Sequence, residues 1–98
     1  MRIRHAFAKA LRQARRSRGL TQEDFSEVSS RTYLSTLERG QKSPTLDKID
    51  VLSQTMDIHF LSLLTLTHLH LESGSDIDTI LERIRLEVGH VRKRTQGA

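Results

Sequence analysis

The segment from residue 20 to residue 40 constrains the fold most, because two short helical patterns follow one another there with almost no chain between them. Thr21 stands at the start of the first pattern and can cap its helix through the side-chain hydroxyl. Ser29 and Ser30 interrupt the pattern, and either can cap a second helix over residues 31–39. Two short helices joined by so few residues are expected to meet at a steep angle.

Helical patterns also flank this segment on both sides. The spacing of apolar residues predicts a first helix over residues 5–18 and two more over 45–56 and 59–71. No stretch alternates with period two, so we expect an all-α protein with five helices and one further C-terminal amphipathic helix. The sequence Glu-Ser-Gly-Ser after the fifth helix is a linker, which predicts one domain over residues 1–72 and a second unit over 73–98.

The expected core is small and aliphatic. Hydrophobic residues make up 36% of the 98 residues, with no Trp and one Tyr. On the fourth helix we expect one inward stripe of Leu46, Ile49, Leu52 and Met56. A core this modest often gains stability from oligomerisation.

The C-terminal helix carries the pattern of a narrow coiled-coil seam. Its apolar residues follow one another in steps of four, three, four and three. We expect this seam to form a symmetric homodimer, and two alternatives remain open: the helix could fold back on its own core, or it could receive a second protein such as an antagonist. The seam residues are Ile77, Leu81, Ile84, Val88 and Val91.

Composition argues against several classes of function. There is no Cys, so thiolate chemistry and disulfides are excluded. The lack of Cys is also compatible with a protein of the reducing cytosol. No apolar run is long enough to span a membrane, and the charged N-terminus does not resemble a secretory signal. Five histidines invite a metal site, but His68 and His70 fall on different faces of a helix. We therefore expect no metal, no cofactor and no enzymatic activity.

Positive charge is concentrated at the N-terminus. The first 18 residues contain seven Arg and Lys and no acidic residue, in a chain with net charge +4. Such asymmetry indicates an anionic partner. Taken alone, it is equally compatible with a solvated helix face, and a membrane surface is a further alternative.

Four short motifs, taken together and in this order, resemble the lambda-repressor-like, or Cro/C1-type, helix-turn-helix family. The resemblance covers residues 5 to about 66 and implies a five-helix DNA-binding domain whose third helix enters the major groove of double-stranded DNA. The motifs are Leu11-Arg12-Gln13-Ala14-Arg15, Gly19-Leu20-Thr21-Gln22, Tyr33-Leu34-Ser35-Thr36-Leu37-Glu38-Arg39-Gly40 and Pro44-Thr45-Leu46.

The resemblance also implies roles for single residues. Arg15 and Glu38 would form an ion pair that holds the Arg15 guanidinium near the DNA backbone, since a planar guanidinium can satisfy a carboxylate and a phosphate together. Gln22, at a helix start, would bond a phosphate. The remaining candidates are Arg39, Tyr33 and Lys42 for phosphates, and Arg31, Thr32, Ser35 and Thr36 for base edges.

The chain departs from the family pattern mainly in the turn between the second and third helices. That turn is about two residues short and lacks the usual glycine, which affects the tilt of the third helix and the register of its base contacts. Ser26 stands where a small Ala is usual, and Asp57 stands where Gly is common. Both changes are mild, because Ser is small and Asp tolerates a left-handed backbone.

We expect a sequence-specific transcriptional regulator, a repressor that binds a palindromic operator as a homodimer in the cytoplasm, associated with the nucleoid. The alternative is a protein-interaction module that reuses the fold, for example an antitoxin with an antagonist or toxin protein as its partner. DNA binding should weaken steeply with salt, because each neutralised phosphate releases counterions. Binding by an interaction module would not.

Overall fold

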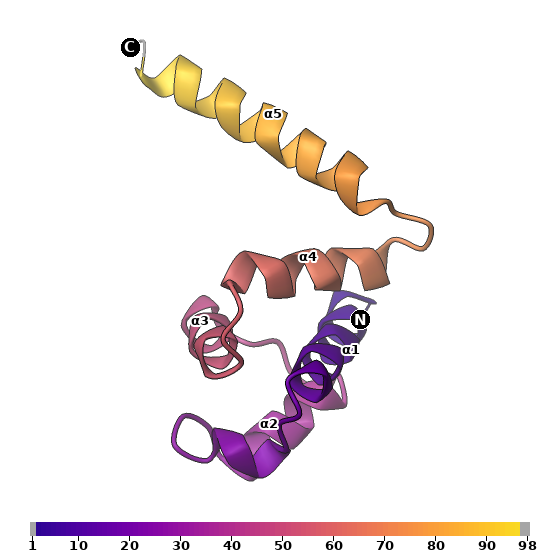
Figure 1. Cartoon of the computed structure of the whole chain (residues 1–98), viewed down its shortest axis with the longest axis vertical. Helices are drawn as coiled ribbons and strands as arrows, with labels where there is room; N and C mark the ends of the chain where they lie inside the picture. Colours follow the sequence, from indigo (N-terminus) through magenta and orange to yellow (C-terminus); the bar gives the residue numbers. More distant parts are fainter. Residues whose placement is uncertain (1, 97–98) are drawn as a thin grey trace.

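The computed structural model describes residues 2–96, and within that range every regular element is a helix (Figure 1). The expected all-α class is confirmed, with five elements in the N-terminal part and one long helix after them. In chain order they are α1 (Arg2–Ser17), the 3₁₀ helix η1 (Gln22–Phe25), α2 (Arg31–Glu38), α3 (Leu46–Thr55), α4 (Phe60–Leu71) and α5 (Ile77–Gln96).

Helix α1 is the centre of the core and packs mainly on α4 and α2. Its small residues Ala10 and Ala14 let the neighbouring helices approach closely, while Phe7 and Leu11 fill the space between them. The other buried apolar residues come from each of the next four elements, so that all five elements close around one cluster. These are Phe25, Leu34, Leu37, Ile49, Leu52, Met56 and Leu63.

The second helix differs from its expected form. In place of an α-helix the structure has one turn of 3₁₀ helix, followed by turns up to Ser29. The backbone N–H of Thr21 donates to the Asp24 carboxylate at 2.7 Å, so the reach-back half of a capping box is formed. The cause is the short corner: α2 begins at Arg31, and the few residues before it must both bury Phe25 and turn the chain. Short 3₁₀ segments are the usual solution where an α-helix has no room to continue.

Local caps set the ends of the next two helices. Ser30 accepts from the backbone N–H of Tyr33 at 3.0 Å and starts α2, and Thr45 accepts from the N–H of Lys48 at 3.1 Å and starts α3. Asp57 ends α3 with a left-handed φ of 55°. The expectation that Leu46 faces inward is wrong: as the first residue of α3 it precedes the buried stripe, and its side chain is 76% exposed.

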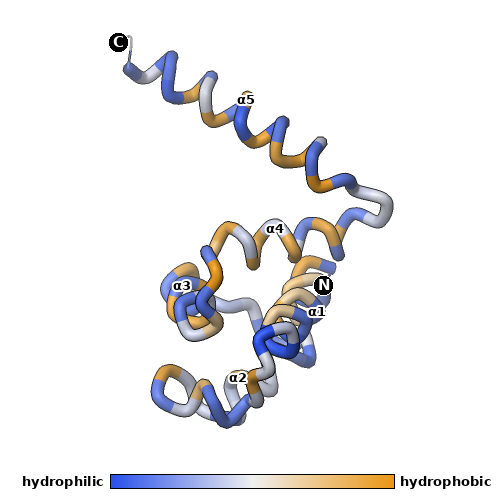
Figure 2. The backbone as a smooth tube through the Cα atoms, in the orientation of Figure 1, coloured by the Kyte–Doolittle hydropathy of each residue, from blue (hydrophilic) through white to orange (hydrophobic). Residues whose placement is uncertain are grey.

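Helix α5 stands away from the other helices (Figure 1). Glu72 and Ser75 close a turn through Gly74, whose φ is +83°, and Asp76 then caps the new helix by accepting from the N–H of Thr79 at 3.0 Å. No residue from Ile77 to Gln96 is buried, so the helix does not fold back to complete the core of its own chain. Figure 2 shows apolar and polar residues alternating along most of α5, with polar residues alone at its C-terminal end.

Across residues 2–96, none of the helices combines the length and the apolar character that a membrane crossing requires.

Candidate nucleic-acid interface

A buried ion pair connects α1 to α2. The Arg15 Nε donates to Oε2 of Glu38 at 2.6 Å, and Nη2 donates to Oε1 at 2.9 Å, so the two planar groups meet side by side. The remaining Arg15 nitrogen, Nη1, donates to the carbonyl of Leu20 at 2.9 Å. The hydrogen bonds that Arg15 donates to Glu38 raise the pKa of Arg15, against the opposing effect of burial. The guanidinium therefore ties α1, the chain before η1, and α2 into one unit.

Two further side chains extend this network to the surface. Gln22, the first residue of η1, donates from Nε2 to Oε1 of Glu38 at 3.2 Å. Arg12 donates from Nη2 to the backbone carbonyl of Glu38 at 2.6 Å, and its Nε lies 3.8 Å from the carboxylate. The sequence had indicated no role for Arg12. The sequence does contain one indication of this role: Arg12 stands three residues before Arg15, so both side chains lie on one face of α1 and can reach the same partner.

The outward side of α2 forms a shallow polar concavity. Its lining comes from the start of η1 and from successive turns of α2, a set of residues that lie far apart in an extended chain. The lining residues are Gln22, Arg31, Thr32, Ser35 and Arg39. The structure therefore brings together three of the four candidate base-contacting residues and two of the candidate phosphate contacts. We call these five residues the α2 concavity.

Both arginines of the α2 concavity are exposed, but they are held differently. Arg31 lies 3.7 Å from the Glu23 carboxylate, with both side chains more than two-thirds exposed, so this pair is weak and easily exchanged. Arg39 donates from Nη1 to the Ser35 hydroxyl at 2.7 Å and from Nη2 to the Gln41 side chain at 3.4 Å. Arg39 is thus oriented over the last turn of α2.

Three other candidate residues, Thr36, Tyr33 and Lys42, do not line the α2 concavity. Thr36 donates its hydroxyl to the carbonyl of Thr32 at 2.7 Å within α2. Tyr33 is half-buried, and the Lys42 ammonium lies over its ring at 5.9 Å from the centroid. Lys48 approaches the same ring at 5.3 Å. Tyr33 and its two lysines form a second cationic site beside α2.

Apart from Arg15, the positive residues of α1, together with Arg18, which follows it directly, divide into two groups. Arg2, Arg4 and Arg18 donate to backbone carbonyls of distant segments, at 3.1 Å, 3.3 Å and 3.0 Å. They therefore fasten α1 to other parts of the chain. A second group lines a separate shallow depression on α1, made by Lys9, Arg12, Gln13, Arg16 and Ser17.

Residues 11–63 match a helix-turn-helix family model, and this is more than half of the chain. The chain belongs to the Cro/C1-type helix-turn-helix family. It is 42% identical over 55 residues to the HTH-type transcriptional regulator y4dJ of Sinorhizobium fredii (strain NBRC 101917 / NGR234), a match that covers 54% of this chain and 71% of that relative. No solved structure matches.

The Cro/C1-type segment contains the α2 concavity and the whole Arg15–Glu38 network, and it ends within α4. The start of α1 and all of α5 lie outside it. In the family's terms, α2 of this chain is the second helix of the motif, and η1 takes the place of the first. Within the described part of this Cro/C1-type chain, no three His, Asp or Glu side chains gather in a way that could hold a metal ion.

Proposed function

We propose that this protein is a DNA-binding transcriptional regulator that inserts the outward side of α2 into the major groove of duplex DNA. The observation that carries the proposal is the α2 concavity, where arginine, hydroxyl and amide groups gather on the exposed side of the second helix of the motif. This mixture suits DNA, because Arg and Gln bond base edges and phosphates, and Thr and Ser can do either. Membership of the Cro/C1-type family supports the same function.

In this proposal Arg31, Thr32, Ser35 and Thr36 contact bases. Arg31 is the strongest candidate, since it is exposed and its weak pair with Glu23 can be exchanged for the O6 and N7 atoms of guanine. Thr36 is the weakest in the observed rotamer, because its hydroxyl bonds the backbone of its own helix. Its methyl group could still meet a thymine methyl.

Phosphate contacts are assigned to two groups of side chains. Gln22 and Arg39 belong to the α2 concavity, and Tyr33 with Lys42 forms the cationic site beside α2. Arg15 has all three of its nitrogens engaged inside the protein, and its side chain is 11% exposed. We therefore propose that Arg15 mainly positions Gln22 and α2 through Glu38, and that it reaches a phosphate only by sharing a donor.

Selection of binding sites from a random duplex library at near-physiological salt tests this function. The expected result is an enriched inverted repeat, with half-sites about one helical turn, roughly 34 Å, apart. Binding should also fall steeply as salt is raised. Enrichment of no sequence, together with salt-insensitive binding to a protein partner, would instead favour an interaction module.

Two substitutions separate base reading from phosphate binding. Arg31→Ala should relax preference at one base pair, at a cost of about 1–3 kcal/mol for the preferred site. Arg39→Ala should weaken binding to all sequences alike. Arg2→Ala is the charge-matched control, because Arg2 donates to the carbonyl of Leu71 at the end of α4 and does not line the α2 concavity. Uniform weakening by Arg31→Ala would show that the proposed register of α2 is wrong.

We further propose that the protein acts as a homodimer and represses transcription by occluding a promoter. A single α2 touches few base pairs, and a twofold dimer on a palindrome doubles the recognised sequence. The seam of α5 supports this, since Ile77, Leu81, Ile84, Val88 and Val91 are each between 42% and 59% exposed in the single chain. Residues 73–98 would then be the dimerisation unit and residues 1–72 the DNA-binding domain.

Because α5 buries no residue in the single chain, its surface can be changed without loss of the core. Ile84→Asp should convert a dimer to a monomer when mass is measured by light scattering. Leu86→Asp is the matched control, because Leu86 is equally apolar and 57% exposed but lies on the opposite side of α5 from the seam. An equal effect of both substitutions, or a wild-type monomer, would contradict the proposed seam.

A further inference from the structure

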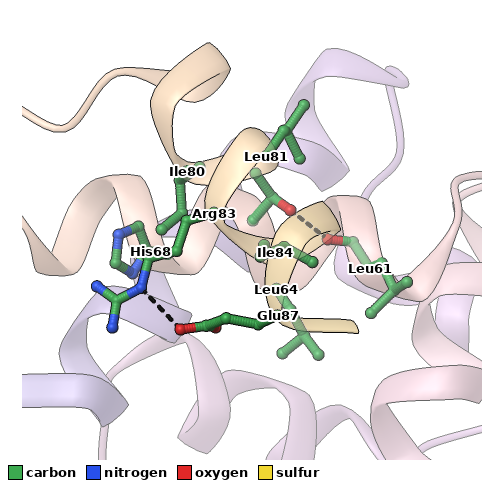
Figure 3. A pocket seen from close by; sticks show the side chains of 9 residues that line it. Leu61, Leu64, His68, Ile80, Leu81, Arg83, Ile84 and Glu87 are labelled. Atoms are coloured by element: carbon green, nitrogen blue, oxygen red, sulfur yellow. Dashed lines mark hydrogen bonds and ion pairs between the residues drawn. The ribbon is translucent and has the colours of Figure 1, made fainter. Parts of the chain in front are cut away.

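Helices α4 and α5 enclose an open apolar groove that nothing in the single chain fills. On the α4 side it is lined by Leu61, Leu64 and His68, and on the α5 side by Ile80, Leu81 and Ile84 (Figure 3). Leu61 is 54% exposed and Leu81 is 45% exposed. An apolar groove that continues into an apolar helix seam is the kind of surface that a protein normally covers.

The charges along α5 are distributed unevenly. In the middle of the helix, Arg85 bonds Glu82 at 2.6 Å and Arg83 bonds Glu87 at 3.1 Å, so these charges compensate each other (Figure 3 shows the second pair). The hydrogen bond that Arg85 donates also lowers the pKa of Glu82, so that this carboxylate stays ionised to a lower pH.

The two ends of α5 keep opposite net charges. Asp76 and Asp78 stand at the first turn, and Arg92, Lys93 and Arg94 at the last. Within residues 2–96, none of these five side chains takes part in an ion pair. A second α5 that runs in the opposite direction would bring each acidic end to a basic end, whereas a parallel partner would bring like charges together. Antiparallel pairing also aligns the two helix dipoles favourably.

We propose that the groove between α4 and α5 is filled by the α5 helix of a second copy of this chain, running antiparallel to the first. This proposal rests on the homodimer of the proposed function and specifies its geometry. In it, Leu81 packs against the partner's Val91, and Ile84 against the partner's Val88.

The register follows from the heptad spacing of the seam. Asp78, Arg85 and Arg92 recur every seven residues and therefore border the seam on one side of α5. Antiparallel pairing brings this same side of the two helices together, so that Asp78 of each copy meets the partner's Arg92. The Arg85 residues then approach each other near the twofold axis, where each keeps the hydrogen bond to its own Glu82.

The position of the groove is compatible with DNA binding by both copies. Helix α5 lies at one end of the molecule and α2 lies at the other, separated along its longest dimension by α1 and α4 (Figure 1). A dimer formed through α4 and α5 therefore leaves both α2 concavities open. The 20 residues of α5 give the paired helices a length of about 30 Å, enough for several seam layers.

Disulfide trapping in the full chain tests the orientation, since the natural sequence has no Cys. Leu81→Cys and Val91→Cys are made separately, and one carries a tag so that mixed and pure dimers differ in mass. Under a glutathione redox buffer, the mixture should form the mixed disulfide dimer several times more efficiently than either variant alone. Cross-links within each pure variant would show parallel pairing and overturn the proposal.

Charge exchange gives a second, independent measurement. Asp78→Arg should raise the dimer dissociation constant in sedimentation experiments by roughly tenfold, since two attractive pairs become repulsive. Adding Arg92→Asp should restore dimerisation even though both ends of α5 then carry unfavourable charges for the helix dipole. Failure of the second change to restore it would overturn the proposed register. A wild-type protein that is monomeric, with no cross-link in any variant, would instead contradict the homodimer itself. DNA binding is tested separately, by the selection of binding sites from a random duplex library.

Discussion

The Glu38 carboxylate should contribute more to stability than any other single charge in the chain, and Glu38→Gln tests this. The carboxylate is 4% exposed and accepts from Arg15 at 2.6 Å and 2.9 Å and from Gln22 at 3.2 Å. Glutamine has nearly the same shape as glutamate but no charge. Its amide NH₂ group would point at the N–H donors of Arg15 or Gln22 and could not accept from them. The substitution therefore leaves the Arg15 guanidinium inside the protein without its counterion.

The expected cost follows from the geometry. Two unit charges about 4 Å apart interact by roughly 4 kcal/mol at an effective dielectric constant of about 20. Breaking one side of a buried pair costs about 3–5 kcal/mol in measured cases. Arg15 keeps its bond to the Leu20 carbonyl, and Gln keeps one acceptor, so we expect about 3 kcal/mol. For a chain of this size that corresponds to a fall in melting temperature of roughly 12–24 °C.

Urea unfolding followed by circular dichroism measures this cost. The midpoint should fall with an unchanged slope, because the unfolded chain exposes the same surface. Glu82→Gln is the matched control. The Glu82 carboxylate lies 2.6 Å from Arg85, as close as the buried pair, but its side chain is 54% exposed, so the substitution should give no measurable shift. Equal midpoints for Glu38→Gln and Glu82→Gln would refute the reasoning, because burial would then make no difference.

A double change refines the same argument. Arg15→Met with Glu38→Leu removes both charges, so no buried charge is left without its counterion, and the double variant should be more stable than Glu38→Gln alone. It should nevertheless bind DNA less well than the wild type, because Gln22 and α2 would lose the bonds that position them. A double variant as unstable as the sum of the two single variants would show that the two side chains act independently.

Three further substitutions test the local structure by thermal or urea unfolding. Gly19→Ala should cost about 1 kcal/mol, and Gly40→Ala should destabilise the fold more. Both residues have φ near +70°, but only a Cβ at Gly40 would meet another side chain, at 2.6 Å from the His5 ring. In a His5→Ala background the two substitutions should therefore cost the same. Ser30→Ala should cost about 1 kcal/mol by removing the cap of α2, and an unchanged midpoint would contradict that role. Phe25→Ala should cost about 3–5 kcal/mol, since the fully buried ring anchors η1, and a cost near zero would mean that η1 is not held by the core.

The helix boundaries could be predicted closely because their signals are local. Ser30, Thr45 and Asp76 cap the helices that follow them, and Gly40 and Asp57 end helices with left-handed backbones. Each signal depends on residues within one turn of the boundary. Two helices differ from their predicted bounds. Helix α1 begins at Arg2 and not at residue 5. For the second helix, Thr21 and Asp24 favour a helix start, but its length depends on where α2 must pack against α1. That distance is a tertiary quantity and does not appear in the spacing of residues along the chain.

The outward residues of α2 could also be identified from local sequence, because the helical period places Arg31, Thr32 and Ser35 on one side of the helix. What the sequence could not predict is which polar groups are already engaged by the protein. The Gln22 amide is bonded to Glu38, and Arg12 donates to the Glu38 backbone. Both bonds depend on how closely η1 and α1 approach the last turn of α2, and that approach is fixed by the buried apolar residues between them.

The basic N-terminus illustrates why composition alone overestimates the charge available to a partner. Seven positive residues without an acid suggest a uniformly cationic helix. Arg2, Arg4 and Arg18, however, donate to backbone carbonyls of segments 37 to 69 residues away, and Arg15 neutralises Glu38. The acceptors of the first three are exposed carbonyl oxygens at helix ends and turns. More than half of the positive residues in this segment therefore bond the chain itself, and the cations that the proposed function places against DNA are those that α2 and its following loop hold at the surface.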